Sequence, residues 1–468
     1  WRNQQEALYT FYLPEGSVVS SASLWVNGKE EPAYLTTKSK ADSAYQAIVG
    51  RERRDPLLLH WQEGSKVTVR VFPCTPAEER QFKIGITTPL KNENGVLEYE
   101  NIDFKGPYWN HANEEITIVA EDGLQNMDTP FYFGQSGTAY TYSGKYHSKW
   151  SLTFDEVPLA KAPFYFNGKA YRVEPYETQT TSFAPRDIYL DINKAWTKKE
   201  LMVIWGKVKK QKVWVYANNR MQAVTESNIK PLFHHLKNNN FTLFPFHKIG
   251  HPQSALVISK YHQMTPTISD IGKSKFAKRI SDFLGELDEP IKVFNLGEEQ
   301  SQYLKTLKEI RSIQLESGLV QDLADLLDQK SFIRNQEDEA TVVNQYSGLK
   351  IQKVSSPGNQ VSKAPDHLMR LFVYNDILKQ LGKDYFNKKK NSESLIPMAS
   401  EAYVVTPISS LIVLETQEDY DRFNIKKSKN SLNNAAILDS GAVPEPHEWL
   451  LIILVMLLTL YFYTKQLS

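Results

Sequence analysis

The chain has 468 residues, which is enough for two or three domains. Its 55 basic and 54 acidic residues nearly cancel, so no net field draws it to nucleic acid or to anionic lipid. The single cysteine, Cys74, excludes an internal disulfide framework and a cysteine-rich metal site.

Residues 1–180 have the pattern of a β-rich domain. Apolar and polar residues alternate with a period of two in segments such as SVVSSASLWVNG and SKVTVRVFP, and turn residues separate the segments. One stretch, residues 37–52, predicts a helix, because Ala41, Ala44, Tyr45 and Ile48 recur on one helical face. This pattern predicts a β-sandwich with one packed helix.

Within residues 5–120 a series of short motifs resembles the vault protein inter-alpha-trypsin domain, or VIT domain. The matching motifs are Ala44-Tyr45, Gly50-Arg51, Asp55-Pro56-Leu57-Leu58, Val69-Arg70-Val71-Phe72-Pro73 and Glu79-Arg80. The resemblance implies a scaffold without enzymatic activity.

Three arginines beside the second motif could form a basic patch, but we interpret them as structural. Arg51 or Arg54 is expected to pair with Asp55 or Glu79 and to hold the loop.

From Asp187 the pattern changes to short apolar strands that alternate with amphipathic helices. Over residues 187–330 this alternation predicts a doubly wound α/β sheet with parallel strands. A von Willebrand factor type A domain commonly follows a VIT domain, and this stretch resembles one. Two or three domains, one β-rich and one α/β, therefore make up the predicted fold class.

The von Willebrand A family binds a divalent cation at the carboxyl edge of its sheet, through a D-x-S-x-S loop and a later Thr and Asp. Here Asp191 matches, Asn193 offers an amide, and Ala195 has no oxygen to donate. Where the family has its later Thr and Asp, this chain has Ser259-Lys260, and the positive charge of a lysine repels a cation. Because hard cations need several oxygen ligands, Asp191 and Asn193 are interpreted as remnants of a site that binds no metal. No cofactor is predicted.

Other candidate chemistries lack parts that they need. The string IGKS at residues 271–274 has Thr267 where a phosphate loop needs its first glycine. The histidines of this region are interpreted as loop and surface residues, namely His234, His235, His247, His251 and His262. With no G-x-S-x-G motif either, the chain is predicted not to be an enzyme.

Residues 331–425 are predicted to be a membrane-proximal α+β region. It contains a helix over 367–386 and a buried strand in the string SSLIVLET, residues 409–416. That string, with the DYDRF that follows, resembles a segment that precedes the anchor in exosortase-associated bacterial VIT proteins.

A transmembrane helix is predicted for residues 447–464. No charge occurs between Glu448 and Lys465, and such a helix spans roughly 24 Å against a hydrocarbon core of about 30 Å. A core helix is rarely apolar on every face at the end of a chain. The residues expected to anchor it at the membrane interfaces are Trp449, Leu450, Tyr463 and Lys465.

Residues 426–446 form a polar stalk that ends in the sequence Val443, Pro444, Glu445 and Pro446. Each proline keeps its predecessor out of the α region, so this tetrapeptide is extended. With the apolar helix it resembles the VPEP variant of the PEP-CTERM sorting signal. The resemblance implies recognition and cleavage by an exosortase. Because an outside anchor needs an export signal and none precedes Trp1, we expect a fragment that lacks its N-terminal portion.

Together these features predict a non-enzymatic, exosortase-sorted protein of the bacterial cell envelope that mediates protein–protein interaction or adhesion. Its soluble domains would lie outside the cytoplasm, anchored in membrane lipid by the C-terminal helix or released at the surface after processing. The expected partners are the exosortase and an unidentified protein or surface ligand, with no nucleic acid. The alternatives are an accessory or dedicated substrate of the sorting machinery and, less favoured, a hydrolase of unrecognised type.

Overall fold

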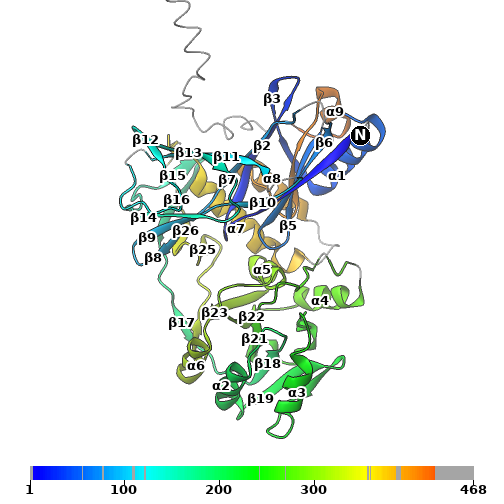
Figure 1. Cartoon of the computed structure of the whole chain (residues 1–468), viewed down its shortest axis with the longest axis vertical. Helices are drawn as coiled ribbons and strands as arrows, with labels where there is room; N and C mark the ends of the chain where they lie inside the picture. The colour runs from blue at the N-terminus through cyan, green and yellow to red at the C-terminus, as the bar shows by residue number, and fades with distance from the viewer. Residues whose placement is uncertain are drawn as a thin grey trace, which may run out of the picture.

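A computed structural model describes residues 4–54, 56–75, 79–107, 111–120, 123–241, 243–268, 270–272, 274–355, 358, 360–385 and 392–426. The chain forms two parts, which Figure 1 shows one above the other. The α/β domain, in green, comprises residues 183–333. The body is rich in β-structure and contains segments from both sides of that domain, residues 4–175 and 341–426.

The main sheet of the body has six antiparallel strands, and one of them comes from near the end of the described chain. In spatial order they are β10 (Asp103–Lys105), β1 (Gln5–Tyr12), β6 (Lys66–Cys74), β5 (Leu57–Gln62), β27 (Ser409–Val413) and β4 (Tyr34–Thr37). Leu411 of β27 lies opposite Leu59 on one side and Leu35 on the other. In Figure 1 the orange C-terminal segment accordingly lies among the blue N-terminal strands.

Both faces of this sheet are covered, which explains why every residue of β27 is buried. Leu411 and Val413 join the core under a three-stranded sheet and helix α7, whereas Ile412 joins the core under α1. The covering elements are β3 (Lys29–Pro32), β2 (Val18–Val26), β7 (Phe82–Thr87), α7 (His367–Leu381), α8 (Ile396–Ala402), α1 (Lys38–Ala47) and α9 (Gln417–Arg422). The helix predicted from Ala41, Ala44 and Tyr45 is confirmed as α1, and its apolar face is buried.

The other sheets of the body are smaller. One joins both sides of the body again, through β15 (Phe164–Phe166), β16 (Lys169–Pro175), β26 (Leu349–Val354) and β25 (Thr341–Asn344). Two three-stranded sheets lie between residues 91 and 155. They are β14 (Ser151–Asp155), β9 (Val96–Glu100) and β8 (Lys91–Glu93), and β11 (Asn113–Val119), β13 (Ala139–Lys145) and β12 (Gly134–Ser136).

The α/β domain is a six-stranded sheet in which only the edge strand β20 is antiparallel. In spatial order the strands are β20 (Arg220–Ala223), β19 (Lys212–Ala217), β18 (Asp187–Asp191), β21 (Ala255–Lys260), β22 (Ile291–Leu296) and β23 (Ile313–Gly318). Its helices are α2 (Lys198–Val208), α3 (Ile229–Leu236), α4 (Lys275–Gly285), α5 (Gln302–Glu309) and α6 (Val320–Gln329). Residues of α2, α3 and α6 share one core, and residues of α4 and α5 share the other.

Local sequence signals start several of these helices. Thr197 and Glu200 form a capping box at the start of α2. The hydroxyl of Ser274 accepts a hydrogen bond from the Ala277 N–H at the start of α4, and Ser301 caps α5 in the same way.

The chain enters and leaves the α/β domain through two strands that pair with each other. Strand β17 (Thr180–Ser182) leads in, and β24 (Ser331–Ile333) leads out. The α/β domain is therefore an insertion into the body. Residues 331–425, predicted to form a separate region, instead supply β25, β26, α7, α8 and β27 to the body.

The β-rich N-terminal part and the mixed α/β character of the chain are as predicted. The transmembrane helix predicted at 447–464 and the VPEP motif at 443–446 lie outside the described residues, which end at 426. Within the described ranges, no helix is long and apolar enough to cross a membrane.

Candidate functional site

The carboxyl edge of the α/β sheet contains the residues predicted to be the metal remnant. Strand β18 lies in the middle of the sheet, and the chain adds strands first on one side of it and then on the other. In such sheets ligands bind outside the carboxyl ends of the strands, where the strand order reverses. Asp191 ends β18 and lies opposite Ser259 of β21, and Asn193 follows two residues later. The structure thus brings these residues together at the expected place.

Their polar atoms are bonded to one another. The hydroxyl of Ser259 donates to Asp191 Oδ2 at 2.7 Å. Asn193 Nδ2 donates to the Lys260 carbonyl at 2.8 Å, and Asn193 Oδ1 accepts from the Ala195 N–H at 2.9 Å. Asp191 and Asn193 are both buried. Asp191 Oδ2, the Ser259 hydroxyl and Asn193 Oδ1 are therefore each engaged in an internal hydrogen bond.

Lys260 forms an ion pair at the same edge of the sheet. Its Nζ lies 2.7 Å from Glu200 Oε1, on the capping box of α2. Burial alone would raise the pKa of Glu200, but the Lys260 ammonium and the hydrogen bonds from Thr197 hold it below its usual value. The Lys260 ammonium therefore lies at the same edge of the sheet as Asp191 and Asn193. Across the described ranges, no group of three or more His, Cys, Asp or Glu side chains is arranged to hold a metal. That the domain needs no metal stays a prediction.

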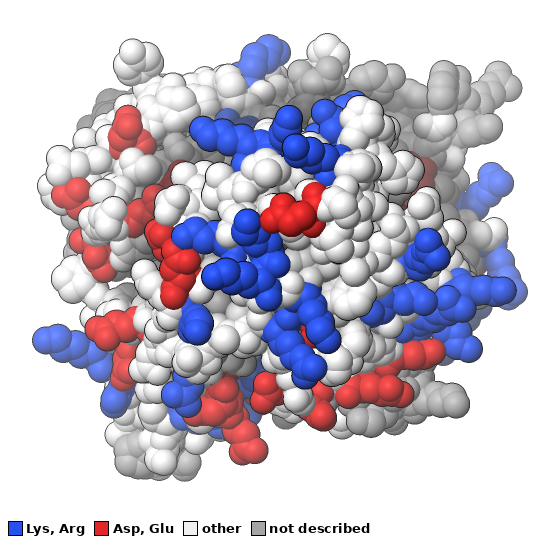
Figure 2. Space-filling view, turned by 90° about the horizontal axis from the view of Figure 1, so that it is seen from below, with Lys and Arg blue, Asp and Glu red and all other residues white. Residues whose placement is uncertain are grey.

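The histidines of this domain do not form one group. His234 and His235 are exposed neighbours on α3, and the other three lie in the connections before and after β21. His251 Nδ1 lies 3.4 Å from Asp187 Oδ2, and His262 Nδ1 accepts from the Met264 N–H. His247 packs edge-on against Phe276. Figure 2, seen from the α/β end, shows that basic and acidic side chains are interspersed over this face. Exposed lysines of the α/β domain include Lys198, Lys199, Lys209 and Lys210.

Arg54 has a structural role, but its partners are not those predicted. Its guanidinium binds Asp419 through two hydrogen bonds of 2.7 Å, and it also pairs with Glu52. Asp55, one predicted partner, lies outside the described residues. Burial alone would raise the pKa of Asp419, yet Arg54 and Thr416 hold it low. The arginine therefore ties α9 to the loop after α1. Cys74 is partly exposed, and burial raises the pKa of its thiol, which makes it a poor nucleophile.

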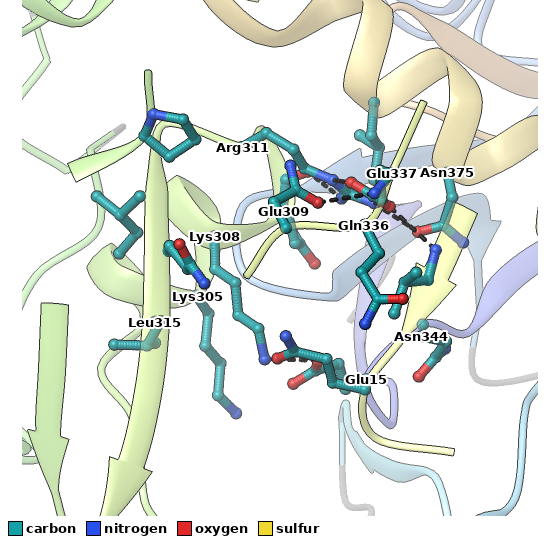
Figure 3. A pocket seen from close by; sticks show the side chains of 18 of the residues that line it. Glu15, Lys305, Lys308, Glu309, Arg311, Leu315, Gln336, Glu337, Asn344 and Asn375 are labelled. Carbon is teal, nitrogen blue, oxygen red and sulfur yellow. Dashed lines mark hydrogen bonds and ion pairs between the residues drawn. The ribbon is translucent and has the colours of Figure 1, made fainter. Parts of the chain in front are cut away.

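A second candidate site lies between the body and the α/β domain. A pocket of about 140 Å³ is lined from the domain by Lys305, Lys308 and Glu309 of α5 and by Arg311. From the body it is lined by Glu15, Ser65, Tyr374 and Asn375, and from the connection after β24 by Glu337. Figure 3 shows Arg311, Glu337 and Asn375 together at one end and Lys305, Lys308 and Glu15 at the other.

Arg311 is the centre of one end of this pocket. Its guanidinium binds both oxygens of Glu337, at 2.9 and 2.8 Å. It also donates to the Glu309 carbonyl at 2.6 Å and to Asn375 Oδ1 of α7 at 3.3 Å. Burial alone would raise the pKa of Glu337, but Arg311 and the Val343 N–H hold it below its usual value. A bidentate pair of this kind fixes orientation as well as charge, so Arg311 joins the domain to the body.

Glu309 is the unusual group of the pocket. The Ser65 hydroxyl donates to Glu309 Oε1 at 2.5 Å, while the buried Oε2 has no hydrogen-bond partner among the described residues. Burial raises the pKa of Glu309 to about 7. The Lys308 ammonium is held 2.7 Å from Glu15. Near neutral pH this carboxyl therefore exists in both protonation states, which makes the interface between the two parts sensitive to pH.

Sequence reasoning missed this pocket. Lys308, Glu309 and Arg311 lie in a stretch whose charges have the pattern of a solvated helix face. Ser65 and Glu309 are 244 positions apart, and no local pattern predicts that they meet.

Comparison with protein families finds one match. The family described as the vault protein inter-alpha-trypsin domain matches residues 2–86. A VIT domain is therefore present at these residues, over a shorter range than the predicted 5–120. The match contains β1 to β6 and most of β7, but β10 and β27 of the same main sheet lie outside it. Comparison of the chain with curated proteins finds no match.

Proposed function

We propose that this chain is a non-enzymatic protein of the bacterial cell envelope, sorted by an exosortase through its VPEP tail. In this proposal the body displays the α/β domain for protein–protein interaction or adhesion. The observation that carries it is the place of β27. Strand β27, residues 409–413 of the last described segment before the tail, is an integral part of the sheet to which the VIT range contributes β1, β4, β5 and β6.

This position suits an anchored protein. Any force on the tail reaches the body through α9 and β27, and β27 is hydrogen-bonded to a neighbour on each side. Arg54 adds a two-bond contact from the VIT range to Asp419 of α9. A tail joined to a central strand is harder to pull away than a tail joined to a frayed end, because several hydrogen bonds must break together.

We also propose that the α/β domain is a degenerate von Willebrand A-type domain. The central first strand, the antiparallel edge strand and the position of Asp191 at the strand-order reversal support this assignment. The bond between Ser259 and Asp191 and the pair between Lys260 and Glu200 support the loss of its cation site. Binding through this domain would then rely on its protein surface.

The alternative is an accessory or dedicated substrate of the exosortase machinery. The segment 409–423 favours it, because it resembles a segment of exosortase-associated VIT proteins and its strand, residues 409–413, is buried rather than displayed.

The sorting proposal is tested at the tail. In the native host, mass spectrometry of the mature protein should find a C-terminus before Trp449, because prolines at 444 and 446 disfavour a helix and so favour the extended form that an endoprotease accepts. Replacing Pro444 and Glu445 by alanine should keep a longer, membrane-bound form. The control variant replaces Asn433 and Asn434 of the stalk by alanine and should be processed normally.

Two results would contradict the proposal. One is a mature wild-type protein that retains Ser468, which would make the tail a plain anchor. The other is normal processing of the variant with alanine at positions 444 and 445.

A further inference from the structure

Strand β11 is an edge strand with one free side. Within the described part of the chain it pairs only with β13, over all seven of its residues. Figure 1 shows its sheet, in cyan, at one side of the body. An edge of this length exposes a row of backbone donors and acceptors that can pair with another strand.

The register shows which backbone groups are free. The Tyr146 N–H donates to the Ala112 carbonyl at 3.0 Å, and the Ala120 N–H donates to the Thr138 carbonyl at 3.1 Å. Hydrogen-bonded pairs alternate along an antiparallel ladder, so the even-numbered residues of β11 bond to β13. The N–H and C=O groups of Asn113, Glu115, Thr117 and Val119 therefore point away from it.

An open cleft of about 620 Å³ runs along this free side. Every residue from Asn113 to Ala120 lines it. Side chains of successive residues point to opposite faces of a strand, so one cavity contacts all of them only if it follows the strand edge. The rest of the lining is mostly apolar and aromatic, and includes Leu90, Tyr99, Phe104, Leu124, Tyr146, Trp150, Leu152 and Phe154.

The two faces of β11 differ in chemistry. Ile116 and Ile118 are partly buried on one face, whereas Asn113, Glu115, Thr117 and Val119 are exposed on the other. A strand added beside β11 would therefore place alternate side chains against the apolar wall. Its other side chains would lie beside Glu115, where a basic residue gives a favourable cross-strand pair.

We propose that β11 binds an extended peptide segment of a partner protein as an added strand, with apolar residues alternating with basic ones. Backbone hydrogen bonds to the odd-numbered residues supply affinity, and the aromatic wall and Glu115 supply selectivity. At about 3.3 Å per residue, the seven residues of β11 can pair with roughly 23 Å of partner strand. The proposal adds a binding site to the body and does not depend on processing of the tail.

The test uses the full chain and a blocked eight-residue peptide of alternating lysine and valine, with binding followed by fluorescence anisotropy. Thr117→Pro removes an N–H that points to the free side and leaves the ladder with β13 intact, because proline is tolerated at a strand edge. We expect it to weaken binding about tenfold or more. The matched variant Thr117→Val keeps the N–H and should bind as the wild type does.

Two further measurements distinguish a loss of binding from a folding defect. Glu115→Lys changes an exposed residue and should reverse the preference from the lysine peptide to a glutamate–valine peptide. The lysine–valine peptide methylated on every amide nitrogen has no N–H to donate from either edge and should not bind. Equal affinity of the two Thr117 variants would overturn the proposal. So would no binding of the lysine–valine peptide at millimolar concentration, or binding of oligosaccharides in its place.

Discussion

The two parts of the molecule are assembled in opposite ways. In the α/β domain all six strands come from residues 187–318, and each crossover is completed within a short stretch of chain. In the body, β27 inserts between β5 and β4, so His60 and Ser410, which are 350 positions apart, are hydrogen-bonded. The strands of the α/β domain therefore come from one continuous stretch of chain. The body is complete only when the segments that precede and follow that domain pair with each other.

This difference has a consequence for folding. Contacts that are distant in sequence form only after the loop between them has closed. The α/β domain can fold as soon as residues 183–333 are available, and its entry and exit strands β17 and β24 then bring the two halves of the body near each other. The inserted domain thus shortens the effective loop between β5 and β27.

The largest effect is expected when the central contact of the body is removed. Leu411 is fully buried between Leu59 and Leu35. Leu411→Asp buries an unpaired charge, so we expect the body to lose more than about 4 kcal/mol. The α/β domain should keep its own unfolding transition in a denaturant titration followed by circular dichroism. Val361→Asp, at an exposed apolar residue of the body, is the control and should change little. A single shared transition that shifts equally for both parts would contradict the account.

Sequence predicts local features in both parts of the molecule but not the contacts between distant segments. Leu411, Ile412 and Val413 predict a buried strand, and β27 confirms it, but nothing in that string names β4 and β5 as neighbours. At the α/β edge, the resemblance to the von Willebrand A domain predicted that Asp191, Asn193 and Ser259 lie together, and the structure places Asp191 opposite Ser259, with Asn193 two residues later. The pair between Lys260 and Glu200 was missed, since a helix cap gives no sign of a partner across the sheet.

Arg370 makes a buried contact between α7 and β2 of the body that can be tested separately. It is 1% exposed on α7 and donates to the Ser20 carbonyl of β2 at 2.9 Å and to Asp366 at 3.0 Å. Arg370→Ala leaves both partners without their donor, and we expect a loss of about 3 kcal/mol or more in the free energy of unfolding of the body. Arg172→Ala, at an exposed position of β16, is the matched control. Equal stabilities of the two variants would show that α7 is not held to β2 by this contact.

Glu309 tests the interface between the two parts through pH. Its folded-state pKa of about 7 lies above its unfolded value, so the folded state binds more protons between about pH 4.5 and 7. Stability should therefore fall as pH rises through this window, by about 3 kcal/mol in all. Glu309→Gln should remove that fall, matching the wild type near pH 4.5 and exceeding it at pH 8. Glu286→Gln, on an exposed helix end, should keep the wild-type profile. A wild-type profile that stays flat from pH 5 to 8 would contradict the assignment.

The smallest effect is expected at the carboxyl edge of the α/β sheet, where the degenerate cation site is proposed. Because Ser259 and Lys260 engage Asp191 and Glu200, adding Mg²⁺, Mn²⁺ or EDTA should move the melting temperature of the α/β domain by no more than about 1 °C. A shift of several degrees on chelation would mean that the edge binds a cation after all.

The central claim is that β27 completes the sheet of the VIT domain, and hydrogen exchange of the intact chain tests it most directly. The strand is buried along its whole length and pairs on both sides, so its amides open only when the body unfolds. Residues 409–413 should exchange as slowly as β5, residues 57–62, under native conditions. Exchange of residues 409–413 within seconds, while β5 remains protected, would contradict it.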